Sequence, residues 1–258
     1  MKRTLTKLLK YSLFAIIAAF LGFLVTYGQY VSNISGEVHT FNAHAPVAQQ
    51  HSLTKKRAVE RSRSSSVRIL SFDVHAGMIA TSSATYFEHK DEKFVLTTNH
   101  GLVGSCATIQ IEADGKLYDC VEILVNDRLI DYAILKIDTI ENRKPIAVPR
   151  DLVRHARGWK KTLSLLNQVV YTGYPNSIGP LTVEGSIMGF DPAGLIYVQS
   201  YAWSGSSGSG VFDNHGNLIG YIMAIDIGNT QYGTAILENV MLVVPIYKVD
   251  WSVVYKRG

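Results

Sequence analysis

Cysteine is scarce in this sequence, because Cys106 and Cys120 are the two present among 258 residues. Two cysteines are too few for a disulfide scaffold, so the chain has to bury a hydrophobic core instead. The pair flanks a predicted hairpin whose turn is Asp114-Gly115. A two-residue turn leaves the pair three positions out of register, so a disulfide needs a bulge or a longer turn. A disulfide and two separate buried thiols both stay open.

Charge is also scarce, at 18% of the residues, and positive charge is concentrated at one end. Residues 1–65 hold nine of the 25 Lys/Arg residues and two of the 21 Asp/Glu residues. Residues 66–258 therefore carry a net charge of −3. A slightly acidic body argues against a basic face for nucleic acid. No cluster of His, Cys, Asp or Glu has metal-ligand spacing, so we expect neither a metal ion nor another cofactor.

One long uncharged run lies near the N-terminus, at residues 11–27, directly after a segment with four basic residues. The positive-inside rule predicts a cytoplasmic basic segment at 1–10 and a transmembrane signal-anchor helix at 11–30. The rest of this single-pass membrane protein is then extracytoplasmic, either periplasmic or extracellular. A cleaved signal peptide is the alternative, although the A-x-A at 43–45 lies far from the apolar run. Residues 31–65 are polar and low in periodicity, which predicts a flexible tether.

Helical periodicity is almost absent from residue 66 onward. The chain shows short apolar runs separated by turn residues, which are typical of strands in an all-β protein. This pattern predicts two six-stranded antiparallel β-barrels, over about 66–145 and 160–246, followed by a short helix at 247–255. The predicted strands are 67–72, 84–88, 93–98, 107–112, 116–125, 132–137, 166–174, 182–190, 194–200, 210–213, 217–225, 234–239 and 240–246.

The run GSSGSG at 205–210 places small residues between aromatic and apolar neighbours, which is unlike a linker. Glycines on both sides of Ser207 permit unusual dihedrals and close approach of a substrate, as a nucleophilic serine requires. The N–H groups of Gly205 and Ser207 are the candidates for an oxyanion hole. The α/β-hydrolase alternative is disfavoured, because only His215 follows the serine and the surrounding pattern is β.

A nucleophilic serine needs a histidine base and an acid that orients this base. Among the eight histidines, His100 closes an apolar strand in FVLTTNHGLV and precedes a turn of small residues. Asp131 directly precedes the apolar run YAILKI, where a carboxylate is shielded and can bond an imidazole. Asp127 and Asp138 lie nearby as alternatives to Asp131.

These three segments, FVLTTNHGLV, DYAILKI and GSSGSGVFD, resemble the catalytic blocks of chymotrypsin-fold serine proteases. The likeness is strongest to the bacterial HtrA (DegP-like) and glutamyl-endopeptidase branches, and it covers roughly residues 66–255. The order His, Asp, Ser fits, with separations of 31 and 76 residues. The resemblance implies a trypsin-like serine protease domain over 66–258, and no PDZ domain is expected after it. It also implies that His100 is the general base, that Asp131 orients it, and that Ser207 is the nucleophile.

In this family, residues just before the nucleophile and on a later strand line the pocket for the substrate side chain before the cut. No acid stands at the matching positions, and Ile222 occupies the place of the Glu-selecting histidine of glutamyl endopeptidases. The resemblance therefore implies a preference for small or medium apolar side chains. The expected pocket residues are Tyr201, Ala202, Trp203, Ile222, Met223 and Ala224.

Two functions of different classes follow from these observations. The first is a membrane-anchored serine endopeptidase that acts on extracytoplasmic proteins or peptides through an acyl-enzyme. The second is a catalytically silent pseudoprotease that serves as a membrane-tethered peptide-binding module, since fold alone does not guarantee activity. A zymogen activated by cleavage near Arg61 or Arg63 is a lesser alternative, and the sequence gives no oligomeric state.

Overall fold

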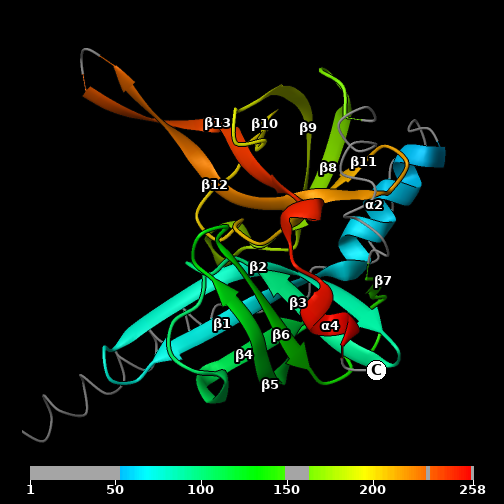
Figure 1. Ribbon diagram of the computed structural model, residues 1–258, viewed down its shortest axis with the longest axis vertical. Helices are drawn as coiled ribbons and strands as arrows, with labels where there is room; N and C mark the ends of the chain where they lie inside the picture. The colour runs from blue at the N-terminus through cyan, green and yellow to red at the C-terminus, as the bar shows by residue number, and fades with distance from the viewer. Residues whose placement is uncertain (1–52, 149–162, 231–232, 257–258) are drawn as a thin grey trace, which may run out of the picture. The chain divides into compact units, whose positions relative to one another are not determined.

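The computed structural model describes residues 53–148, 163–230 and 233–256. Strands dominate this part of the chain and form two sheets, each closed into a six-stranded barrel. Figure 1 shows one barrel built from the cyan and green half of the chain and the other from the yellow and orange half. The predicted all-β class with two six-stranded barrels is confirmed.

Barrel 1 closes because β1 (Ser66–Asp73) pairs with β4 on one side and with β2 on the other. Alternation along β1 places Val67 and Ile69 in the core, fully buried, while Arg68 between them stays partly exposed. The strand order is β1-β4-β5-β6-β3-β2, and the short β7 adds to β2 in parallel. The other strands are β2 (Met78–His89), β3 (Glu92–Thr97), β4 (Ile109–Ala113), β5 (Lys116–Asp127), β6 (Tyr132–Ile137) and β7 (Ile146–Ala147).

Barrel 2 is a closed sheet with the strand order β10-β13-β12-β11-β8-β9. The runs 234–239 and 240–246, predicted as two strands, belong to one strand, β13, which pairs with β12 over a long hairpin. The outer ends of this hairpin extend beyond the barrel in Figure 1. The strands are β8 (Gln168–Gly173), β9 (Leu181–Phe190), β10 (Ile196–Gln199), β11 (Gly210–Asp213), β12 (Leu218–Thr230) and β13 (Gly233–Pro245).

A single hydrophobic cluster joins the two barrels. It contains Phe87 and Leu96 from barrel 1 and Phe212 from barrel 2, all at most 1% exposed. The C-terminal segment completes it, because the Trp251 ring lies 4.9 Å from that of Phe87. After the 3-10 turn η3 (Ile246–Lys248), the predicted C-terminal helix is present as one turn, α4 (Ser252–Tyr255). The C-terminal segment therefore fastens barrel 2 to barrel 1.

Residues 53–65 form the helix α2 (Leu53–Ser65), so the prediction of a flexible tether is wrong for this part of 31–65. The helix carries no stripe of large apolar residues, which is why its sequence resembled a linker. Its buried face is made of Ala58, Val59, Ser62 and Ser65, whose small side chains let the helix approach barrel 2 closely. The Ser62 hydroxyl bonds that of Thr172 on β8 at 2.9 Å.

The N-terminal predictions concern residues that the structure leaves undescribed, namely 1–10, 11–30 and the first part of 31–65. Within the described residues, no helix has the length and apolar character needed to cross a membrane.

Cys106 and Cys120 form a disulfide with a Cα–Cα distance of 5.3 Å. The hairpin keeps its two-residue turn, because Ala113 pairs with Lys116. The 3-10 turn η1 (Cys106–Thr108) folds the chain back before β4 begins, and this turn brings the two cysteines into reach. Neither a bulge between the cysteines nor a longer hairpin turn was needed.

Candidate active site

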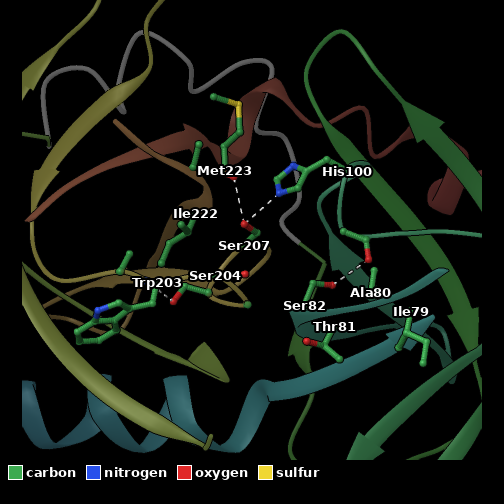
Figure 2. Close-up of a pocket in the computed structure, with 15 residues that line it drawn as sticks. Ile79, Ala80, Thr81, Ser82, His100, Trp203, Ser204, Ser207, Ile222 and Met223 are labelled. Atoms are coloured by element: carbon green, nitrogen blue, oxygen red, sulfur yellow. Dashed lines mark hydrogen bonds between the residues drawn. The ribbon is translucent and has the colours of Figure 1, made fainter. Parts of the chain in front are cut away.

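His100 lies just beyond the end of β3 and bonds to two side chains that are far from it in sequence. Its Nδ1 lies 2.6 Å from Oδ2 of Asp131, and its Nε2 lies 3.1 Å from Oγ of Ser207. Figure 2 shows the imidazole and the Met223 carbonyl on either side of the Ser207 hydroxyl, at 3.1 and 3.3 Å. The structure thus brings together the three residues predicted as base, orienting acid and nucleophile.

Asp131 is held in an unusual backbone conformation directly before β6, with φ of +58°. Positive φ is uncommon for a residue other than glycine and marks local strain. The conformation lets both carboxylate oxygens serve His100, since Oδ1 also accepts the backbone N–H of His100 at 2.9 Å. The alternative Asp127 is occupied elsewhere, because its Oδ1 accepts the N–H groups of Leu129 and Ile130.

Tyr221 of barrel 2 supports the segment that carries Asp131. Its hydroxyl donates to the carbonyl of Ile130 at 2.9 Å. Burial raises the pKa of Tyr221 well above its usual value, and the negative charge of Asp131 raises it further. The phenol therefore stays protonated and able to donate throughout the physiological pH range.

The loop that carries Ser207 needs its glycines for space as well as for conformation. Gly205 and Gly208 have φ of +91° and +88°, which other residues rarely adopt. A Cβ at Gly205 would lie 2.6 Å from the Tyr174 carbonyl oxygen, and one at Gly208 would lie 2.0 Å from that of Ser83. The loop therefore packs directly against the backbone of other segments.

The two backbone N–H groups predicted to bind an oxyanion belong to Gly205 and Ser207. The Ser204 carbonyl accepts the N–H of Asn176 at 2.6 Å, and in a trans peptide the following N–H points the opposite way. The Ser206 carbonyl likewise accepts the N–H of Ser209 at 3.1 Å. Neither the Gly205 nor the Ser207 N–H donates to any residue in the described part of the chain.

The model of the trypsin-like peptidase domain matches residues 82–220, which is more than half of the chain. The chain belongs to the trypsin-like peptidase family. This confirms the resemblance to chymotrypsin-fold serine proteases drawn from the three sequence blocks, and the matched range contains all three of His100, Asp131 and Ser207.

Two solved protease structures resemble this trypsin-like peptidase in fold. The serine endoprotease from Yersinia pestis is 19% identical, with a TM-score of 0.57 over 78% of this chain and 63% of that one. The HtrA-type protease AlgW with tripeptide is 20% identical, with a TM-score of 0.55 over 73% of this chain and 58% of that one. At these identities the likeness concerns the fold alone.

A curated relative of the peptidase is the anti-sigma-I factor RsgI9 of Acetivibrio thermocellus. It is 30% identical over 162 residues, which are 61% of this chain and 20% of the relative. The chain therefore spans about a fifth of the length of this relative.

The peptidase has a cavity of about 610 Å³ beside Ser207, and His100 is the only titratable side chain among the residues that line it. Five of the six predicted pocket residues line this cavity: Ala202, Trp203, Ile222, Met223 and Ala224. Tyr201 does not line it, because its side chain is 59% exposed and its ring stacks on that of Trp203 at 5.9 Å.

Sequence reasoning missed several residues at this site. Residues 79–82 of β2 line the cavity, and Figure 2 shows Ile79 and Thr81 on the side away from Trp203. Asn176, which holds the Ser204 carbonyl, was also missed, because it contributes only a backbone N–H. Within the described residues, no group of three His, Cys, Asp or Glu side chains can hold a metal ion.

Proposed function

We propose that this trypsin-like peptidase is an active serine endopeptidase that hydrolyses peptide bonds through an acyl-enzyme. The observation that carries the proposal is the continuous hydrogen-bonded series Asp131–His100–Ser207, with distances of 2.6 and 3.1 Å. The serine hydroxyl is within reach of a base, and the base is within reach of an orienting carboxylate, as nucleophilic catalysis by serine requires.

In the proposed mechanism, Ser207 Oγ attacks the scissile carbonyl while Nε2 of His100 takes the hydroxyl proton. Asp131 fixes the tautomer of His100 and stabilises the imidazolium that forms. The negative charge on the former carbonyl oxygen is stabilised by the N–H groups of Gly205 and Ser207. His100 then gives its proton to the leaving amine. A water molecule, activated by the same imidazole, hydrolyses the ester to release the second product.

The proposed preference is for a small or medium apolar side chain before the cut. Trp203, Ile222 and Ala224 offer apolar surface to the cavity, and its lining provides no carboxylate for a Lys or Arg side chain. Sequencing of products from a peptide library should give Ala, Val or Leu before the cut. Predominant cleavage after Arg or Glu would overturn this part of the proposal.

The proposed location is extracytoplasmic, with a membrane anchor at residues 11–30. The Cys106–Cys120 disulfide supports it, because disulfides persist mainly in oxidising compartments. The substrates would then be extracytoplasmic proteins or peptides. The full chain should sediment with membranes. Protease added outside the cytoplasmic membrane should cleave the chain between the anchor and the folded domain and so release the domain. Recovery in the cytoplasmic fraction with reduced cysteines would contradict the location.

Labelling with a fluorophosphonate probe separates the enzyme from a pseudoprotease. The wild-type chain should be labelled, and Ser207→Ala should not. The control is Ser164→Ala, which changes an exposed serine in the loop before β8 and should be labelled like the wild type. Peptide binding without labelling of the folded wild-type chain would favour a silent peptide-binding module.

A further inference from the structure

Ser83 of β2 is a fully buried serine that holds the nucleophile loop from the other barrel. Its N–H donates to the Ser207 carbonyl at 2.9 Å, and its hydroxyl donates to the Gly205 carbonyl at 2.7 Å. The same hydroxyl accepts the N–H of Tyr174 at 2.8 Å, and the Ser83 carbonyl accepts the Thr97 hydroxyl at 2.7 Å. One residue of barrel 1 therefore bonds two carbonyls of the Ser207 loop of barrel 2.

The direction of the Gly205 N–H depends on the two peptide groups that flank this glycine. The preceding peptide is held at the Ser204 carbonyl by the N–H of Asn176, and the following one is held at the Gly205 carbonyl by the Ser83 hydroxyl. Glycine has no side chain to restrict its dihedrals. The two hydrogen bonds are thus what keeps this N–H turned away from Asn176 and available to an oxyanion.

The Ser83 hydroxyl supports both of these bonds, one directly and one through Tyr174. Tyr174 directly precedes the 3-10 turn η2 (Pro175–Ser177), which presents the N–H of Asn176 with φ of 49° at that residue. Because the Tyr174 N–H donates to the Ser83 hydroxyl, this hydroxyl also fixes the start of the turn. Both restraints on the Gly205 N–H therefore depend on the Ser83 hydroxyl oxygen.

We infer that Ser83 is a positioning residue whose hydroxyl holds the oxyanion hole open before substrate binds. The inference rests on the proposed function, since it concerns the geometry of the same site. A side chain without the hydroxyl would leave the Gly205 carbonyl and the Tyr174 N–H without this partner, and the peptide before Gly205 could then turn its carbonyl into the hole.

The first test compares catalysis with inhibitor binding in Ser83→Ala. Loss of one oxyanion donor costs on the order of 100-fold or more in kcat, so an indirect loss should lower kcat by about 10-fold or more. KM for the same peptide should stay within about two-fold, because ground-state binding does not use the hole. A peptide boronate, whose tetrahedral adduct places an oxygen in the hole, should bind more weakly by the same factor as kcat falls.

Ser66→Ala is the matched control. Ser66 is also buried in barrel 1, and its hydroxyl donates to a carbonyl of barrel 2 outside residues 204–208, that of Thr172, at 2.9 Å. This variant should melt at a lower temperature, as Ser83→Ala should, but keep the wild-type kcat. Ser83→Cys, with a weaker donor and acceptor, should have an intermediate kcat. Equal losses of kcat in Ser66→Ala and Ser83→Ala, or an unchanged kcat in Ser83→Ala, would overturn the inference.

A crystal structure of Ser83→Ala gives an answer that does not depend on activity. The Ser204–Gly205 peptide should have turned, with its carbonyl no longer bonded to Asn176. An unchanged peptide would overturn the inference even if the enzyme is slow. Absence of fluorophosphonate labelling in the wild type would instead count against the proposed function, and the crystal structure would still decide the role of Ser83.

Discussion

The two barrels contribute to the site in different ways. In barrel 1, β3 and β6 pair with Thr97 opposite Ala133, so the end of one and the start of the other lie at the same edge. This pairing places His100 beside Asp131 within barrel 1, and Tyr221 of barrel 2 adds one bond, to the carbonyl of Ile130. Ser207 lies instead on a loop between β10 and β11, and residues outside barrel 2, such as Ser83, hold this loop. The base and its acid are brought together by strand pairing within one sheet, whereas the nucleophile is positioned by the contact between two.

The largest expected effect comes from breaking the pair within barrel 1. Asp131→Asn should lower kcat by about 10⁴-fold, because an amide no longer fixes the reactive tautomer of the imidazole. Asp127→Asn is the control, since its side-chain oxygen can still accept the N–H groups of the turn at 129–130. Peptide hydrolysis should separate the two variants, and their melting temperatures should be similar. An equal loss of kcat in both would show that the pairing of β3 with β6 does not by itself explain the base.

The next effect concerns the contact between the barrels. Gly208→Ala would bring a Cβ to 2.0 Å from the Ser83 carbonyl oxygen. A Cβ added at Gly77, at the tip of the β1–β2 hairpin, would meet no atom of a more distant residue within 4 Å. Both glycines have positive φ, so each alanine should cost about 1–2 kcal/mol of backbone strain. Only Gly208→Ala should also displace Ser207, lowering kcat/KM by about 100-fold as expected for a misplacement of about 1 Å. If both variants stay equally active, the Ser207 loop does not depend on its contact with barrel 1.

The sequence was sufficient for those parts of the site that depend on local pattern. Alternating apolar runs predicted the two barrels, and the strand-end positions of His100 and Asp131 follow from one pairing of strands. The glycines around Ser207 were also informative, because positive φ and close backbone contact leave few other residue types.

The sequence was insufficient where contacts join residues far apart along the chain. The importance of Ser83 arises from three partners more than 90 residues away. The helix α2 was read as a tether because its buried face consists of Ala58, Val59, Ser62 and Ser65 rather than large apolar residues. Tyr201 was assigned to the pocket by position, but its ring stacks on Trp203 outside the cavity.

A smaller effect sharpens the comparison through stability. The Cys106–Cys120 disulfide closes a loop with a sequence separation of 14 within barrel 1. Replacing both cysteines with serine should lower the free energy of unfolding by about 3 kcal/mol, mainly because the unfolded chain is less constrained. Denaturant unfolding with and without reductant measures this, and the wild-type chain in reductant should behave like the double variant. A change below about 0.5 kcal/mol would mean that the disulfide adds little to barrel 1.

The smallest expected effect is on the pH dependence of stability, and it comes from the buried tyrosines of barrel 2. They should lower the stability of the folded chain at high pH. Burial raises the pKa of Tyr171 to about 12, and a bond to Ser206 opposes this only in part. Below pH 10, Tyr171 is protonated in both states and the folded chain has its full stability. Between about pH 10 and 12, the unfolded chain loses this proton first, so stability should fall as pH rises.

Tyr171→Phe should remove this part of the alkaline loss, although losing the bond from its hydroxyl to the Tyr201 carbonyl should cost about 1 kcal/mol at pH 7. Tyr86→Phe in barrel 1 is the matched variant, because burial also raises the pKa of Tyr86 while a bond from the Ile140 N–H lowers it. Urea unfolding at pH 7, 10 and 11 measures how far the free energy of unfolding falls as pH rises. Tyr171→Phe should reduce this fall more than Tyr86→Phe does. The reverse order would place the loss of stability at high pH in barrel 1 rather than in barrel 2.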